Sequence, residues 1–263
     1  MATQPNLPAD EAPLDEETVD LFLSNMGTDM VLVGGQALAF WMSRFGIEQD
    51  GIAISNDGDA LGKVARAIEL GKAMKARVEL PGKTSRTAIV AQLRLPTPGG
   101  KERNIDVLHK LYTVAGLKKA AAFTRSVIED SVEAEWRPGR FIRVMDPFDV
   151  LESRAQNAVG LFVEKGPHVV TQAAWAIQVA REALLRTAAA WGSTDRLGNK
   201  IQRIYALARS QVGRRLLTEH ELELLDAVDL DALRAASPSH EKQLNAVEKA
   251  KGERRRRRSA RAP

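Results

Sequence analysis

A change in the hydropathy pattern at Asp146-Pro147 constrains the fold more than any other feature of the sequence. Before this point, short apolar runs alternate with segments rich in Gly, Pro and Asp, a pattern typical of strands mixed with helices. After it, residues 147–250 are rich in Ala, Leu, Arg, Glu and Gln and have almost no strand pattern. The sequence therefore predicts an α+β protein, with a small mixed-sheet domain over 15–146 and a helical domain over 147–250.

Local patterns predict the individual elements. Strands are expected at apolar, β-branched runs, over 30–33, 52–54, 77–80, 88–95, 103–109, 126–136 and 141–144. Helices are expected where apolar residues recur every three to four positions, from residue 15 and over 36–45, 62–74, 148–163, 169–191, 198–212 and 219–227. The segment PTPGGKE separates two of the strands and is typical of a hairpin turn.

Composition excludes several classes of protein. The chain has no cysteine, so disulfides, thiolate metal sites and a cysteine nucleophile are ruled out. It also has no G-x-x-x-x-G-K-[ST] motif, and its four histidines lack metal-ligand spacing. No apolar run is long enough for a membrane helix, and the polar, acidic start MATQPNLPADEAPLDEE has no signal-peptide pattern. We expect a soluble cytoplasmic protein without a membrane partner.

The basic charge of the chain is concentrated at its end. The formal net charge is +4, yet the last 13 residues, KGERRRRRSARAP, contain seven Lys and Arg and one Glu, so the preceding part is slightly acidic. Residues 251–263 are predicted to be a disordered basic tail, and residues 1–14, with three prolines, a disordered N-terminus. The run from Arg254 to Arg258 would either bind nucleic-acid phosphates in a salt-dependent way or serve only as a solubilising terminus.

Two short motifs in the first half point to chemistry. Gly34-Gly35 stands between a predicted strand and a predicted helix, where backbone N–H groups can face a phosphate; a plain tight turn is the alternative. Asp57 and Asp59 follow Ser55, and in extended chain such i and i+2 side chains share one face, about 6.5–7 Å apart. That arrangement suits oxygen ligands of Mg²⁺, although an Asn-, Asp- and Gly-rich surface turn has the same composition.

A third carboxylate, Asp106, lies within the predicted strand NIDVL. A carboxylate there is costly to bury unless it is paired or metal-bound, and Arg94 or Arg103 across the hairpin are alternative partners. If its strand lies beside Asp57 and Asp59, the three carboxylates can hold two metal ions about 3.5–4 Å apart. The other D-x-D pair, Asp229 and Asp231, falls in a predicted helical stretch and is expected to be solvent-facing charge.

Taken in this order, the motifs resemble those of the DNA polymerase β-like nucleotidyltransferase superfamily. Within it, the chain is most similar to bacterial AbiE-type nucleotidyltransferases, the toxins of type IV toxin–antitoxin systems. The residues that carry the resemblance are LVGGQALAFW (32–41), SNDGDALG (55–62), NIDVLH (104–109) and RVMDPFDVLESRAQNAVGL (143–161). Two features differ from the family pattern: Gly58 replaces an apolar residue between the aspartates, and the spacing from Gly35 to Asp57 is long.

The resemblance implies a nucleotidyltransferase-like N-terminal domain and a role for each motif. Asp57, Asp59 and Asp106 would bind two Mg²⁺ ions, and Asp106 would also help to deprotonate the acceptor hydroxyl. Gly34, Gly35 and Ser55 would line the triphosphate of the NTP, and Arg154 would stand near the nucleotide.

The function implied is Mg²⁺-dependent transfer of NMP from an NTP to an acceptor hydroxyl, in a toxin–antitoxin system with an antitoxin partner. RNA, a protein hydroxyl and a small molecule are all open as the acceptor. A catalytically weak or inactive relative that acts as a nucleic-acid-binding or regulatory module is the alternative.

Overall fold

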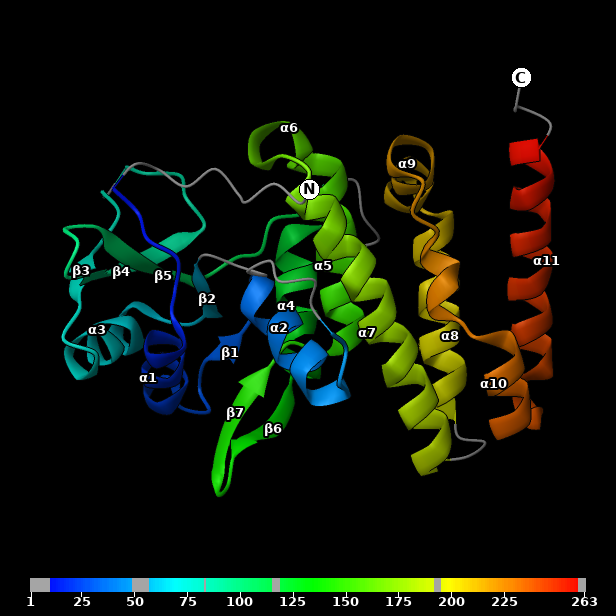
Figure 1. The fold of residues 1–263 in the computed structure, drawn as a ribbon, viewed down its shortest axis with the longest axis horizontal. Helices are drawn as coiled ribbons and strands as arrows, with labels where there is room; N and C mark the ends of the chain where they lie inside the picture. Colours follow the sequence, from blue (N-terminus) through cyan, green and yellow to red (C-terminus); the bar gives the residue numbers. More distant parts are fainter. Residues whose placement is uncertain (1–9, 49–56, 83, 115–118, 192–194, 260–263) are drawn as a thin grey trace.

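The computed structural model describes residues 10–48, 57–82, 84–114, 119–191 and 195–259, and these form an α+β fold. A seven-stranded mixed sheet is built by the first half of the chain, and helices follow it (Figure 1). The last strand ends at Val144 and the next helix begins at Pro147, so the change in sequence pattern coincides with the change in structure. The predicted α+β class, with a mixed sheet followed by helices, is confirmed.

The sheet combines parallel and antiparallel pairs. Its strands are β1 (Val31–Leu32), β2 (Gly58–Leu61), β3 (Arg77–Glu79), β4 (Ile89–Pro96), β5 (Glu102–Leu108), β6 (Val132–Arg137) and β7 (Arg140–Val144). Their order across the sheet is β3-β4-β5-β2-β1-β7-β6. The pairs β1–β7 and β2–β5 are parallel, and the other neighbouring pairs are antiparallel. Strand β2 is therefore central and lies between β5 and β1.

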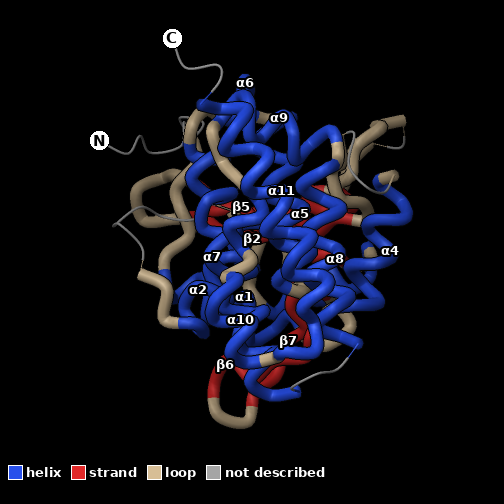
Figure 2. The backbone as a smooth tube through the Cα atoms, turned by 90° about the vertical axis from the view of Figure 1, so that its right-hand side faces the viewer, coloured by secondary structure: helices blue, strands red, loops and turns tan. Residues whose placement is uncertain are grey.

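The helices pack beside this sheet in layers. They are α1 (Glu16–Met26), α2 (Gly34–Phe45), α3 (Val64–Ala73), α4 (Ala120–Asp130), α5 (Pro147–Gly160), α6 (Phe162–Lys165), α7 (His168–Trp191), α8 (Asp195–Arg209), α9 (Gln211–His220), α10 (Leu230–Ala236) and α11 (Glu241–Ser259), with 3-10 turns at Leu224–Ala227 and Pro238–His240. Helices α5 and α7 lie between the sheet and the α8–α11 layer (Figure 1). Figure 2 looks onto the α8–α11 side, with β6 and β7 at the lower end of the molecule.

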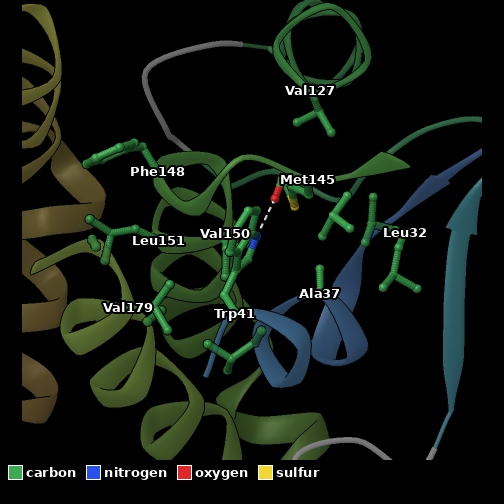
Figure 3. Close-up of a cluster of buried hydrophobic side chains, with 14 of the residues drawn as sticks. Leu32, Ala37, Trp41, Val127, Met145, Phe148, Val150, Leu151 and Val179 are labelled. Carbon is green, nitrogen blue, oxygen red and sulfur yellow. Dashed lines mark hydrogen bonds between the residues drawn. The ribbon is translucent and has the colours of Figure 1, made fainter. Parts of the chain in front are cut away.

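Helix α5 begins where the sequence pattern changes, because Asp146-Pro147 is a strong helix start. The Asp146 carboxylate accepts a hydrogen bond from the Phe148 N–H at 2.9 Å, and Pro147 occupies the first turn, where its missing N–H costs nothing. The hydrophobic core continues across this junction. Trp41 of α2 donates its Nε1–H to the Met145 carbonyl at 2.8 Å and packs among Val150 and Val179 (Figure 3).

Buried charges join α5 to the outer helices. Asp149 and Glu152 lie one turn apart on α5, and their side chains are 0% and 1% exposed. Both accept hydrogen bonds from one nitrogen of Arg203 on α8, at 3.1 Å for Glu152. Burial raises the pKa of Asp149 to about 6, even though Arg203 acts in the opposite direction. Arg203 therefore supplies the cation that both buried carboxylates share, while Lys200 of α8 pairs with Asp146, the residue that caps α5, at 3.3 Å.

Two predicted elements were wrong. The strand expected over 126–136 is helix α4 as far as Asp130, because Phe123 and Val127 bury one helical face, and only β6 is extended. The helix expected over 219–227 instead covers Gln211–His220. Ser210 starts it by accepting a hydrogen bond from the Gly213 N–H, and Glu221 ends it in the left-handed conformation, with φ of 59°.

The described parts of both termini are ordered, contrary to the sequence-based expectation. Residues 10–13 pair with the start of β5, through hydrogen bonds such as Ala12 N–H to the Glu102 carbonyl at 2.8 Å. Residues 251–259 continue α11 instead of forming a disordered tail. Arg254 explains why: it bonds to Glu223 and to the Ala208 carbonyl, so the first arginine of the run is held inside the fold.

No helix in the described ranges is both long and apolar enough to cross a bilayer.

We predict that replacing Arg203 by alanine will destabilise the protein strongly. The change leaves Asp149 and Glu152 buried without their cation, which typically costs about 3–5 kcal/mol. Urea unfolding followed by circular dichroism at pH 8 should show this loss. The loss should shrink at pH 5, because the Asp149 carboxylate, with its pKa of about 6, binds a proton there.

Arg215→Ala is the matched control, because Arg215 pairs with Glu219 at the surface one turn away, an interaction worth about 0.5 kcal/mol. Equal losses in the two variants would show that the α5–α8 contact does not depend on Arg203.

Candidate active site

The register of β2 and β5 places two aspartates side by side. Asp59 of β2 is directly opposite Asp106 of β5 in a parallel pair, so both side chains project from the same face of the sheet. Asp57 immediately precedes β2, and its charge interacts with those of Asp59 and Asp106. All three side chains are partly buried. The three aspartates that the sequence singled out thus lie in one region of the sheet, and Asp106 projects from the same face as Asp59.

The three carboxylates repel one another and are poorly solvated. Burial, followed by the charge of Asp106, raises the pKa of Asp57 to about 6 and that of Asp59 to about 7. Burial also raises the pKa of Asp106, opposed by a hydrogen bond from Gln92 and by the charge of Lys165. A bound cation would stabilise a cluster of this kind, because its positive charge offsets both the repulsion between the carboxylates and their lost solvation.

The Gly34 turn packs directly against Asp59. Gly34 has φ of 69°, and a Cβ built on it would lie 2.1 Å from the Asp59 Oδ2, so a glycine is required for both backbone and steric reasons. The adjacent Val33 N–H donates to the Asp59 carbonyl at 3.0 Å. The start of α2, with Gly34 and Gly35 in its first turn, therefore lies beside the carboxylates.

Cations from the helical half face this cluster. Arg154 of α5 is 7% exposed, and its charge acts on Asp59. Its Nη1 donates to the Gln172 Oε1 at 3.0 Å, and within the described ranges its Nε has no partner. Lys165, at the end of α6, is exposed and lowers the pKa of Asp57, Asp59 and Asp106. Arg154 therefore lies near enough to Asp59 for its charge to lower the pKa of that carboxyl, and its place near a nucleotide stays a prediction.

Several polar residues of the site were missed by sequence reasoning. Gln92 of β4 donates to the Asp106 Oδ1 at 2.9 Å, so an amide forms this contact and not Arg94 or Arg103, the alternative partners considered from the sequence. Arg94 instead bonds to Glu79 at 3.0 Å and Arg103 to Asp15 at 2.6 Å. The one available signal was a glutamine in the otherwise apolar stretch IVAQL.

Other predicted site residues have different outcomes. Ser55, expected beside the triphosphate, lies outside the described residues. Asp229 of the second D-x-D pair has a structural role, because it caps α10 by accepting a hydrogen bond from the Ala232 N–H at 3.1 Å. Asp231 is exposed, as expected for solvent-facing charge.

The chemical type of the side chains suits a metal ion, whereas their present arrangement does not. Carboxylate oxygens are the preferred ligands of Mg²⁺, and the raised pKa values indicate uncompensated negative charge. However, no three His, Cys, Asp or Glu side chains in the described part of the chain are close enough together to hold an ion. Metal binding would therefore require the aspartate side chains to turn toward one another, with the backbone positions set by β2 and β5.

No protein-family model matches this chain, and no curated protein matches it in sequence.

We predict that Gly34→Ala will destabilise the protein by at least about 2 kcal/mol more than Gly46→Ala. Both glycines have φ of 69°, so both changes carry the same backbone strain of about 1 kcal/mol. No atom lies within 4 Å of a Cβ at Gly46, whereas at Gly34 the new atom meets Asp59. Urea unfolding measures the loss of stability in each variant, and the difference between the two losses is the steric cost of the contact with Asp59. Equal losses would show that Asp59 does not pack against the turn.

We predict that Asp59→Asn will stabilise the metal-free protein at neutral pH. The folded-state pKa of about 7 exceeds the ordinary 3.8, so the folded protein binds more protons and its free energy of unfolding falls as the pH rises from about 4 to about 7. The variant lacks this penalty and should gain about 1–3 kcal/mol at pH 7.5, with a smaller gain toward pH 4. The measurement is urea unfolding in EDTA across this pH range. A gain that does not vary with pH would exclude titration of Asp59 as its cause.

Proposed function

We propose that this chain is a divalent-cation-dependent nucleotidyltransferase of the DNA polymerase β-like type. The observation that carries the proposal is the pairing of Asp59 with Asp106 on parallel strands, with the Gly34 turn packed against Asp59. Carboxylates on adjacent strands beside the start of a helix provide what a nucleoside triphosphate needs: ligands for its cation and backbone N–H groups for its phosphates.

Different residues of the chain would have different roles in nucleotidyl transfer. Divalent cations, when bound by Asp57, Asp59 and Asp106, would neutralise the phosphate oxygens of the NTP. The N–H groups at the start of α2, with Gly34 and Gly35, would orient the phosphates. Such a site works by positioning and charge stabilisation, with little covalent chemistry by side chains.

The reaction itself is a substitution at the α-phosphorus. The oxygen of the acceptor hydroxyl forms a bond to this phosphorus, the bond to the β-phosphate oxygen breaks, and pyrophosphate leaves with the electron pair. Asp106 would take the hydroxyl proton, a role that its raised pKa favours. Lys165, exposed at the end of α6, would stabilise charge on the phosphates. The buried Arg154 would add a second positive charge near Asp59.

The biological setting follows the resemblance to AbiE-type toxins. A nucleotidyltransferase of this type would modify an acceptor in a toxin–antitoxin system and would be restrained by an antitoxin. RNA is one acceptor to test, because Arg256 on the basic end of α11 is exposed and could contact phosphates.

A second candidate is a nucleotidyltransferase-like protein that has lost catalysis and acts as a binding or regulatory module. The observation in its favour is that no three potential metal ligands in the described residues converge in this conformation. Nucleotidyl transfer separates the two candidates, because either of them could bind Mg²⁺.

We predict that the wild-type chain will transfer label from an α-³²P-labelled NTP to an acceptor in the presence of Mg²⁺. Each of the four NTPs should be incubated with total cellular RNA, with cell protein and with the chain alone, followed by gel analysis. Asp59→Asn and Asp106→Asn should reduce transfer at least a hundredfold, because each removes an anionic ligand.

Asp231→Asn is the matched control, since it changes the exposed aspartate of the other D-x-D pair. Mg²⁺ should also raise the melting temperature of the wild type at pH 7.5 but not that of Asp59→Asn. Absence of transfer with every NTP, or equal transfer by Asp59→Asn, would rule out the enzyme. A Mg²⁺-dependent melting shift without transfer would favour the inactive module.

A further inference from the structure

The first described residues of the chain pair with the sheet beside the candidate site. Residues 10–13 run past β5 before the chain enters α1 (Figure 1). The Ala12 N–H donates to the Glu102 carbonyl at 2.8 Å, and the Glu102 N–H donates to the Asp10 carbonyl at 2.9 Å. Glu11 stands between these two bonds, directly opposite Glu102 in a parallel bridge. The backbone position of Glu11 is therefore fixed relative to β5.

The pairing places Glu11 on the same face of the sheet as the aspartates. Strand β4 pairs with one edge of β5 along its whole length, so β2 and residues 10–13 share the other edge, end to end. Glu102 and Asp106 are four residues apart on β5, so their side chains project from one face. Their partners on the shared edge, Glu11 and Asp59, project from that face as well. Glu11 therefore extends the row of acidic side chains.

A buried amide lies between Glu11 and the nearest aspartate of β5. The Asn104 side chain, 3% exposed, acts on the Glu11 carboxyl as a hydrogen-bond donor, and its Oδ1 accepts from the Arg94 Nη1 at 3.3 Å. Asn104 precedes Asp106 by two residues, a spacing of about 6.5–7 Å along a strand. The contact with Asn104 thus brings the Glu11 carboxylate to roughly that distance from Asp106.

Asp57 approaches the same place from β2. It directly precedes this strand, whose first residue is opposite Ile105, so Asp57 comes level with Asn104. Burial is the main cause of the raised pKa of both Glu11 and Asp57, and the charge of Asp106 raises both further. The charge of Glu11 also raises the pKa of Asp57. The register and the electrostatics therefore agree that the three carboxylates lie close together.

A structural role for Glu11 would not require its charge. Glutamine has the same length and could accept the hydrogen bond from Asn104 without repelling the aspartates. Glu102, opposite Glu11, differs in this respect because it pairs with Arg77 at 2.8 Å and with Arg94 at 3.5 Å. Among the described residues no ion pair of this kind is formed by Glu11, on which Arg94 acts only at longer range. The negative charge of Glu11 is therefore left for another partner.

We propose that Glu11 is a further acidic residue of the candidate site, where its charge strengthens the binding of a divalent cation by Asp57 and Asp106. This inference rests on the cation site of the proposed function. Glu11 acts on the cation through space and need not contact it. A unit negative charge about 7 Å from a divalent cation attracts it appreciably even where water screens the interaction.

The test is Glu11→Gln, which keeps the length of the side chain and an acceptor for Asn104 and removes only the charge. Mn²⁺ serves as the probe, because electron paramagnetic resonance of the free ion gives its Kd directly. We expect the substitution to raise the Kd of the full chain for Mn²⁺ at pH 7.5 and low salt by about fivefold to fiftyfold.

Asp10→Asn is the matched control, since it makes the same change of charge one residue earlier, at an exposed side chain. Its Kd for Mn²⁺ should stay within about twofold of the wild type. Urea unfolding in EDTA gives a second measurement with a definite sign. Glu11→Gln should be at least as stable as the wild type without a cation, because the change relieves repulsion from Asp57 and Asp106.

The outcomes separate this inference from the proposed function. If the wild type binds Mn²⁺ and Glu11→Gln binds it as tightly, the role of Glu11 is overturned while the cation site stands. Equal weakening by Glu11→Gln and Asp10→Asn would also overturn it, because the effect would not be specific to Glu11. A loss of stability in EDTA with unchanged affinity would assign Glu11 a structural role instead.

Two further outcomes concern the proposed function itself. Specific weakening by Glu11→Gln in a protein that transfers no label from any NTP would support the role of Glu11 and leave the chain as the inactive module. If the wild type does not bind Mn²⁺ at all, both proposals fail.

Discussion

The parallel pairing of β2 with β5 is the constraint on which the candidate site depends. In this register Asp59 and Asp106 are opposite each other on one face of the sheet, at the separation of adjacent strands. The backbone ladder fixes the two Cα positions, so the distance between the carboxylates can change only by rotation of the side chains. Repulsion between them must then be relieved by protons, by neighbouring cations or by a bound ion.

The neighbouring polar side chains offset only part of the repulsion between Asp59 and Asp106. Gln92 donates one hydrogen bond to Asp106, while Arg154 and Lys165 act at longer range, and the pKa of Asp59 still rises to about 7. A structural role alone would be served better by asparagine, which carries no charge. Residues that reduce stability in the absence of a ligand are characteristic of functional sites, because the ligand provides the missing interaction.

Sequence reasoning predicted the parts of the site that depend on local pattern. Gly34 lies between an apolar run and a helical face, and Asp106 interrupts an apolar strand, so both stood out. The role of Lys165 could not be found in this way, and that of Gln92 was signalled only by a polar residue in an apolar strand, because it depends on the pairing of β4 with β5. The basic end of α11 was mistaken for a disordered tail because its composition hid the contacts of Arg254 with Glu223 and the Ala208 carbonyl.

Gly58, which replaces the apolar residue found between the aspartates of the family that the sequence resembles, has a packing explanation. A Cβ at this position would point to the face opposite Asp59 and lie 3.0 Å from the Ile105 Cγ1 and 3.3 Å from the Phe22 Cε1. Helix α1 thus packs so closely on β2 that an apolar side chain between the aspartates would force Phe22 outward. The glycine therefore allows close packing on one face of β2 while Asp59 remains beside Asp106 on the other. Gly58 therefore affects how α1 packs on β2 and does not alter the face of the sheet that carries Asp59 and Asp106.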